Sequence, residues 1–192
     1  YDSARSQTVF FGRGPAGSGL RALSSYSGAE LVLDAYYPPS EPTPAAIAFD
    51  SRRDRLLILR EGNSGLYGLS LSSGDLTYIS GPGDLGNGPA GTGASFFEPS
   101  AIASGPANRF ASVLDSGQPN GLFLIDQLNG DRELVSSSTT GLGPLWINPT
   151  AIATSPDEER AWVCEENARI FAVDAETGAR SLLGEYQGVA GV

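Results

Sequence analysis

A short phrase that occurs three times constrains the fold of this chain more than any other feature. The pattern Pro-x-Ala-Ile-Ala begins at Pro44, Pro99 and Pro149. Each copy is followed by a turn glycine at a nearly constant distance, which is 30 residues (44 to 74), 31 residues (99 to 130) and 29 residues (149 to 178). Such a regular period is typical of proteins in which each repeat is one supersecondary unit.

Each repeat contains four short apolar or alternating runs, and this pattern predicts strands rather than helices. The last two runs flank Ser-Gly-Asp, Asn-Gly-Asp or Thr-Gly-Ala, at residues 73–75, 129–131 and 177–179. Glycine in the middle of these turns supplies the positive φ that a tight hairpin needs. Four antiparallel strands per repeat predict blades of a β-propeller. A β-sandwich is the alternative, but its strands would not recur with the same residues at the same offsets.

The repeats predict that the chain is an all-β segment of a β-propeller. It contains about three full four-stranded antiparallel blades and part of a fourth. The predicted blades are residues 44–80, 99–136 and 149–184. Residues 1–11 match the last strand of a preceding blade, residues 12–43 are predicted as an expanded inter-blade loop with an extra strand over 29–34, and residues 185–192 as a truncated linker. Since propellers close with about four to eight blades, we expect the missing blades to come from the same longer chain or from another chain.

Two glycine-rich stretches, residues 12–17 and 86–91, match the Gly-x-Gly-x-x-Gly pattern of dinucleotide-binding proteins. That pattern binds pyrophosphate only when a helix follows it, with its N-terminus toward the ligand. Here proline, glycine and another predicted strand follow instead. We therefore interpret both stretches as connections and not as nucleotide sites.

The charge of the chain limits its partners. There are 22 acidic and 12 basic residues, which give a net charge of −10. Nucleic acids and anionic membranes are repelled by such a surface on average, and no apolar run approaches the roughly 18 residues of a membrane helix. We expect a neutral or cationic partner, such as a protein or a carbohydrate.

The chain contains no histidine, lysine or methionine. Histidine is the usual general base and transition-metal ligand, and it completes Ser-His and Cys-His nucleophile pairs. Any catalytic reaction would therefore have to use carboxylates, arginines, tyrosines or backbone groups. The lysine-free acidic composition favours an extracellular, periplasmic or cell-surface location, although a biased genomic base composition would explain the arginine preference equally well. Cys164 is the only cysteine, so it forms no internal disulfide, and we predict a small buried residue rather than a reactive thiol.

Residues 96–103 (Phe-Phe-Glu-Pro-Ser-Ala-Ile-Ala), the strand at 110–114, and residues 121–126 with the turn at 129–131 resemble the NHL-type repeat and its six-bladed relatives. The resemblance covers roughly residues 44–183. The sequence departs from that family in having Ala-Ile-Ala for Gly-Ile-Ala, and in lacking the aspartate and asparagine that commonly follow the second strand. Similar propellers are protein-binding scaffolds, carbohydrate or RNA binders, or lactonases with a calcium-like ion in the central channel, so the fold alone does not select a function.

The resemblance implies that the connections before each leading proline and the turns after each second strand lie on one face, around the channel mouth. The residues it places there are Glu41, Glu98, Asn148, Arg60, Glu61, Asp115, Glu165 and Glu166. Several convergent carboxylates would suit Ca²⁺, whereas a solvated acidic rim is the simpler interpretation. Trp146, before the third leading proline, is predicted to anchor its loop or to stack on a ligand. The aspartates Asp126 and Asp174 are predicted to accept hydrogen bonds from turn backbone.

We predict a non-catalytic binding or structural module of a larger secreted or cell-envelope protein, without a cofactor. The speculative ligand-binding residues at the channel mouth are Glu98, Asn148, Arg60, Asp115, Glu165 and Trp146. A binding module could also use the aromatic pair Tyr36 and Tyr37. One alternative is a metal-dependent hydrolase of the lactonase type, with Ca²⁺ in the channel. The other is a subunit of a multi-chain assembly or fibre that completes the propeller between chains.

Overall fold

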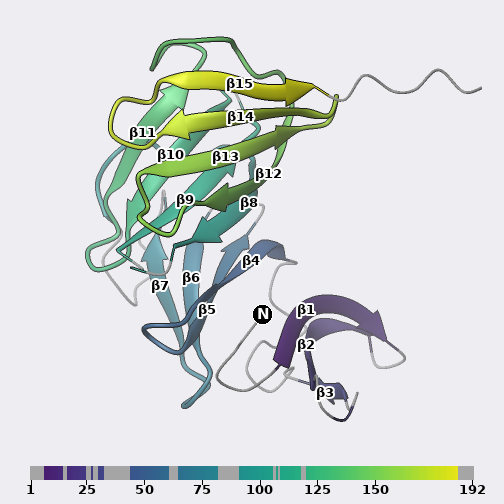
Figure 1. Ribbon diagram of the computed structural model, residues 1–192. Helices are drawn as coiled ribbons and strands as arrows, with labels where there is room; N and C mark the ends of the chain where they lie inside the picture. Colours follow the sequence, from purple (N-terminus) through teal and green to yellow (C-terminus); the bar gives the residue numbers. More distant parts are fainter. Residues whose placement is uncertain are drawn as a thin grey trace, which may run out of the picture.

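The computed structural model describes residues 7–14, 17–24, 27, 30–32, 44–60, 65–81, 91–105, 107, 109–117 and 120–185. These residues form four antiparallel sheets in which consecutive strands are neighbours (Figure 1). No helix occurs among them, and hence none that could cross a membrane. The predicted all-β fold of four-stranded antiparallel blades is confirmed.

Three of the sheets are four-stranded, and each begins at a leading proline. The first blade contains β4 (Pro44–Asp50), β5 (Arg55–Arg60), β6 (Leu66–Ser70) and β7 (Leu76–Ser80). The second blade contains β8 (Pro99–Ser104), β9 (Phe110–Asp115), β10 (Gly121–Asp126) and β11 (Arg132–Ser137). The third blade contains β12 (Pro149–Thr154), β13 (Arg160–Glu165), β14 (Arg169–Asp174) and β15 (Arg180–Glu185).

A three-stranded sheet precedes the first blade and consists of β1 (Gln7–Gly14), β2 (Gly17–Ser24) and β3 (Glu30–Val32). We predicted an expanded connection over residues 12–43 with an extra strand over 29–34. The strand β3 lies within that predicted strand, but β1 extends to Gly14 and β2 was not predicted in this stretch. The reason is that its glycines are paired across a hairpin, with Gly12 opposite Gly19, and that Leu20 and Ala22 are buried against the first blade. The tyrosines Tyr36 and Tyr37 and the glutamates Glu41 and Glu61 lie outside the described residues.

The core lies between the sheets rather than within a single one. Side chains alternate between the two faces of each strand, so the first and second blades are apolar on both sides. The cluster between the first and second blades contains Leu57, Leu59, Leu66, Ile79, Phe96, Ile102, Ala111, Val113, Phe123 and Ile125. The cluster between the second and third blades contains Ala101, Leu114, Leu122, Trp146, Ala161, Val163, Phe171 and Val173. The strand β8 packs against both β4 and β12, which are the first strands of the neighbouring blades.

Candidate functional site

A buried carboxylate organises the edge of the second blade that the resemblance places at the channel mouth, which we call the channel-mouth edge. Asp115 is the last residue of β9, and 1 % of its surface is exposed. Its oxygens accept hydrogen bonds from the backbone N–H groups of Phe97 (2.6 Å), Glu98 (2.8 Å) and Gly117 (2.8 Å). Carboxylates are strong acceptors for backbone N–H groups. Asp115 therefore fixes the segment that leads to Pro99 onto the turn that follows β9.

Glu165 has the same role in the third blade. It is the last residue of β13, is 4 % exposed, and accepts a short hydrogen bond from the backbone N–H of Ile147. It also accepts one from the guanidinium of Arg169 at 2.6 Å, and Arg169 in turn donates to the carbonyl of Leu145. The carboxylates of Asp115 and Glu165 are thus committed to backbone and arginine donors of their own blades.

Glu98 and Asn148 lie beside these anchors, and their side chains are exposed. The Asn148 amide donates to the Glu166 carboxylate at 3.2 Å. The carbonyl of Ile147 accepts a hydrogen bond from the Asn120 amide of the second blade at 2.7 Å. In the second and third blades, the residue before the leading proline therefore lies next to the turn after the second strand. The contact from Asn120 to Ile147 links these two blades at this edge.

Two apolar residues at this edge were missed by the sequence analysis. Phe97 and Ile147 stand two positions before their leading prolines, and they are 64 % and 61 % exposed. Ile147 lines a hollow of about 220 Å³ together with Asn148, Glu166 and Asn167. The sequence did contain a signal for them, because a large apolar residue stands two positions before both Pro99 and Pro149. We had considered only the acidic residues of this edge.

Arg60 occupies, in the first blade, the position that Asp115 and Glu165 occupy in the other two. It is the last residue of β5 and lies opposite Pro44, and it is buried with its guanidinium carbon 3.9 Å from the centroid of the Tyr67 ring. The predicted neighbours of Arg60 on this edge are outside the described residues. The first blade therefore presents a cation–π contact where the next two present carboxylate anchors.

Trp146 is buried, so it does not present a face for stacking on a ligand. Its ring meets that of Phe171 edge-on, with the centroids 6.4 Å apart. Phe96 makes the equivalent contact with Phe123 at 5.4 Å, three residues before its own leading proline. The predicted role of Trp146 as a loop anchor agrees with this packing, whereas the ligand-stacking role does not, because the ring fills the gap between two blades.

A buried arginine stands next to each of these aromatic rings. Arg180 donates hydrogen bonds to the hydroxyl of Ser136 at 2.6 Å and to four backbone carbonyls, those of Ser137, Thr140, Gly143 and Pro144. Arg132 likewise donates to the hydroxyl of Ser80 at 2.8 Å and to the carbonyls of Gly81, Gly93 and Ala94. Burial lowers the pKa of both guanidinium groups, yet arginine stays charged. Each arginine lies at the start of the fourth strand of its blade. Its hydrogen bonds join that strand to the preceding blade and to the connection between the two blades.

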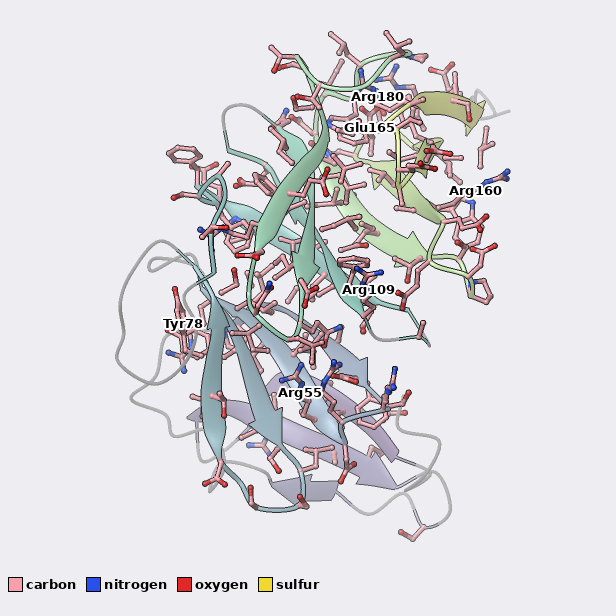
Figure 2. The ribbon with its side chains drawn as sticks, turned by 90° about the vertical axis from the view of Figure 1, so that its left-hand side faces the viewer. Arg55, Tyr78, Arg109, Arg160, Glu165 and Arg180 are labelled. Atoms are coloured by element: carbon pink, nitrogen blue, oxygen red, sulfur yellow. The ribbon has the colours of Figure 1, made fainter. Side chains whose placement is uncertain are left out.

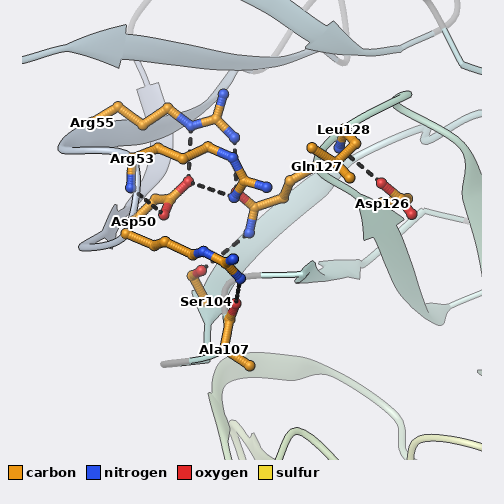
Figure 3. Close-up of polar contacts among 9 residues, drawn as sticks. Asp50, Arg53, Arg55, Ser104, Ala107, Asp126, Gln127 and Leu128 are labelled. Atoms are coloured by element: carbon orange, nitrogen blue, oxygen red, sulfur yellow. Dashed lines mark hydrogen bonds and ion pairs between the residues drawn. The ribbon is translucent and has the colours of Figure 1, made fainter.

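A second polar contact joins the first two blades at their opposite edge (Figure 3). The buried carboxylate of Asp50 accepts from Arg53 and Arg55, at 3.1 and 2.9 Å. Arg55 also donates to the Gln127 side chain of the second blade at 2.9 Å, and Gln127 donates to Ser104. Burial lowers the pKa of Arg55, and the bond to Asp50 opposes this shift. This contact is structural and lies away from the channel mouth; Figure 2 shows Arg55 well separated from Glu165 and Arg180.

The described residues do not support a metal centre. Within the described ranges, no three histidine, cysteine, aspartate or glutamate side chains converge as metal ligands. Ca²⁺ takes six to eight oxygen ligands, and the oxygens of Asp115 and Glu165 already accept the hydrogen bonds described above. Among the described residues of this edge, the oxygens of Asp115 and Glu165 therefore bind donors of the protein itself.

No protein-family model matches the sequence, and no curated protein matches it. Solved structures do match in fold. A chain of the nidogen/laminin complex superimposes with a TM-score of 0.72 over 97 % of this chain at 12 % identity. TolB from Acinetobacter baumannii matches with a TM-score of 0.66 over 94 % at 14 % identity, and an auxiliary nutrient-binding protein from Bacteroides ovatus with 0.67 over 100 % at 12 % identity.

The chain spans 64, 41 and 42 % of the length of those three chains, less than two thirds of each. An oligogalacturonate lyase in complex with manganese also matches, with a TM-score of 0.61 at 12 % identity. At such identities the similarity establishes the fold and not the activity. Together with the four antiparallel sheets, these matches show that the chain has a β-propeller-like repeat fold.

Proposed function

We propose that this chain is a non-catalytic β-propeller module that binds a protein or peptide partner at its channel-mouth edge. The binding surface is formed by Phe97, Glu98, Ile147, Asn148 and Glu166, which we call the rim patch. One observation carries the proposal: two successive blades each present an exposed apolar side chain two residues before the leading proline, on backbone that a buried carboxylate holds in place.

The rim patch is preorganised. The Phe97 and Ile147 N–H groups are bound by Asp115 and Glu165, and the carbonyl of Ile147 is bound by Asn120. A backbone that is already fixed loses little further conformational entropy when a partner covers it. Surface apolar residues held in this way are typical anchors of protein–protein interfaces.

The charges of the rim patch favour a basic partner. Glu98 and Glu166 flank the apolar residues, and both are exposed. The net charge of the chain is −10, so its field accelerates the approach of cationic molecules and opposes that of anionic ones. A peptide segment that combines a large apolar side chain with arginine or lysine matches both properties. The acidic, lysine-free composition supports an extracellular, periplasmic or cell-surface location for this module.

The proposal is tested by selecting ligands from a random peptide library displayed on phage against the immobilised chain. We expect selected peptides to combine apolar and basic residues, and their dissociation constants to rise about tenfold or more, which corresponds to about 1.4 kcal/mol, in a Phe97→Ser, Ile147→Ser double variant. Leu128→Ser is the matched control, because Leu128 is 73 % exposed but lies in the β10–β11 turn at the opposite edge. Equal binding by the wild type and the double variant, or loss of binding in the Leu128 variant, would contradict the proposal.

A further inference from the structure

We propose that the hollow beside Ile147 is a subsite for one arginine side chain of the partner, and that it selects arginine over lysine. Ile147, Asn148, Glu166 and Asn167 line this space of about 220 Å³, which we call the Ile147 hollow. The inference rests on the proposed function, because the Ile147 hollow belongs to the rim patch. It adds which basic residue the partner carries and on which blade that residue is bound.

The Ile147 hollow offers oxygens that accept hydrogen bonds. Glu166 is exposed, and its Oε2 accepts a hydrogen bond from the amide nitrogen of Asn148 at 3.2 Å. Among the described residues, no donor reaches the other carboxylate oxygen of Glu166 or the amide oxygen of Asn148. Both oxygens can therefore accept hydrogen bonds from a ligand, and the negative charge of Glu166 favours a ligand that is a cation.

The other charges beside the Ile147 hollow balance one another. Glu165 is 4 % exposed and forms an ion pair with Arg169 at 2.6 Å. In the orientation that satisfies its amide, Asn167 donates to Oε2 of Glu165 at 2.8 Å and accepts from Nε of Arg169 at 3.2 Å. Glu166 is therefore left with one negative charge that no described cation neutralises, and the hollow has the charge to hold one cation.

The apolar wall of the hollow favours arginine over lysine. Ile147 is 61 % exposed, and a guanidinium can lie against an apolar side chain because it is more weakly hydrated than an ammonium. A guanidinium also presents several N–H groups in one plane, which suits the adjacent oxygens of Glu166 and Asn148. The ammonium of lysine is a compact, strongly hydrated charge that would leave the apolar wall unused.

The walls of the hollow are fixed by backbone hydrogen bonds. The N–H of Glu166 donates to the carbonyl of Asn148 at 3.0 Å, and the N–H of Ala168 donates to the carbonyl of Glu165 at 3.0 Å. The N–H of Ile147 donates to the carboxylate of Glu165. Exposed ion pairs are weak partly because two mobile side chains must be ordered, and a fixed site reduces this entropy cost.

The second blade has the same backbone contact but different side chains. The N–H of Ser116 donates to the carbonyl of Glu98 at 2.9 Å, just as Glu166 donates to Asn148. Serine thus replaces the carboxylate in the turn, and the carboxylate of this blade stands directly before the leading proline instead. The two blades therefore present different polar groups to a partner, and an arginine bound on the third blade fixes the direction in which the partner lies across them.

The experiment uses a peptide from the phage selection whose binding requires Phe97 and Ile147. Each arginine of this peptide is replaced in turn by citrulline, which keeps the shape without the charge, and by lysine. Calorimetric titration gives the dissociation constants with the wild type and with Glu166→Gln. At one arginine, we expect citrulline to raise the wild-type Kd about tenfold or more and lysine about fivefold or more, because a hydrogen-bonded charge is lost or misplaced. In Glu166→Gln both penalties should shrink to less than about threefold, since the two changes remove the same contact.

Two further variants locate the contact. Glu133 is an exposed carboxylate of β11 outside the rim patch, so Glu133→Gln removes an equal charge elsewhere and should leave both penalties unchanged. Glu98→Gln should weaken the binding of all the peptides by a similar factor, and hence also leave the penalties unchanged. A citrulline penalty that disappears in Glu98→Gln and persists in Glu166→Gln would overturn the inference, because the arginine would then lie on the second blade.

The inference and the proposed function fail in different ways. If the peptides require Phe97 and Ile147 but lack arginine, tolerate citrulline at every position, or bind equally well with lysine, the inference is wrong and the proposed function stands. If no peptide requires these two residues, the proposed function is wrong, and the hollow is then tested without a peptide. The methyl resonances of Ile147 should shift on titration with N-acetylarginine amide and not with N-acetylcitrulline amide. Equal shifts with both compounds, or none with either, would overturn the inference.

Discussion

The hydroxyl of Ser136, near the end of the second blade, accepts a 2.6 Å hydrogen bond from the guanidinium of Arg180, at the start of the last strand of the third. The same hydroxyl donates to the carbonyl of Gly178 at 2.8 Å. Ser80 and Arg132 form the same pair one blade earlier, with Ser80 donating to Gly130. Each pair is buried and contains no carboxylate, so the blades are joined by hydrogen bonds from an arginine to neutral oxygens.

Arg180→Met should reduce the free energy of unfolding by about 2–4 kcal/mol, because several buried oxygens lose their donor while the apolar stem is kept. Arg180→Lys should recover only part of the loss, since one ammonium cannot reach the sites of a planar guanidinium. Urea denaturation measures both effects. Arg52→Met is the control, because Arg52 is exposed and has a single contact, of 3.4 Å, to the carbonyl of Ala107. A loss of the same size at Arg52 would show that the buried hydrogen bonds of Arg180 are not the cause.

Trp146→Phe should cost clearly less than Trp146→Ala, because it removes only part of the buried ring and Phe96 occupies the equivalent position in the second blade. The buried indole N–H of Trp146 has no hydrogen-bond partner in the described structure, so no bond is lost. Trp146→Ala should cost about 3–5 kcal/mol because it leaves a cavity. Chemical denaturation followed by circular dichroism compares the two variants. Equal losses would mean that the ring is held by something specific to indole.

Gly143→Ala should destabilise the chain by more than about 2 kcal/mol, since a strained backbone alone costs about 1–3 kcal/mol. Gly143 has a φ of +107°, and a Cβ there would overlap the carbonyl oxygen of Arg180. Gly184→Ala is the matched comparison, because the space around Gly184 is open. Thermal unfolding of the two single variants gives the difference. Similar melting temperatures would indicate that the connection around Arg180 can move away.

Asp131, in the β10–β11 turn, binds Thr92 in the connection between the first and second blades, and this contact depends on pH. Its carboxylate accepts hydrogen bonds from the backbone N–H of Thr92 (2.7 Å) and its hydroxyl (2.8 Å), and these bonds, together with that from Asn129, hold its pKa below the usual value. A folded-state pKa below the unfolded value adds stability above about pH 4, and this stability is lost as the pH falls through the unfolded and then the folded pKa. The wild type should therefore exceed Asp131→Asn in urea midpoint at pH 7, and the difference should narrow below pH 4. A difference that stays constant from pH 7 to pH 3 would be inconsistent with this role.

Much of the fold could be predicted because every repeat places strands and turns at the same offsets. Gly74, Gly130 and Gly178 all have positive φ in the structure, as the turn pattern predicted. Strands close to β1 and β3 were predicted, but β2 was not, because its hairpin with β1 is built from paired glycines, which in a sequence are typical of a loop. Sequence alone therefore did not show that these strands form one sheet. Its pairing depends on burial of Leu20 and Ala22 against a blade that follows more than twenty residues later, and local sequence does not contain that information.

For this edge, the resemblance predicted which residues lie next to one another but not which of them are buried. The resemblance placed Asp115 beside Glu98 and Glu165 beside Asn148, and the structure does the same. The resemblance did not predict that Asp115 and Glu165 are buried and bind backbone N–H groups. The arginines Arg132 and Arg180 were missed because the first repeat has Leu76 at their position, so the comparison of three copies hid a feature that only two share.

The anchoring of the channel-mouth edge has an evolutionary consequence. Asp115 and Glu165 hold the main-chain N–H groups of residues 97, 98 and 147, and not their side chains. Every amino acid except proline carries that N–H group. Mutation at these three positions can therefore change the side chains that this edge presents while the hydrogen bonds that hold its backbone are kept, so the surface can diversify without rebuilding the architecture.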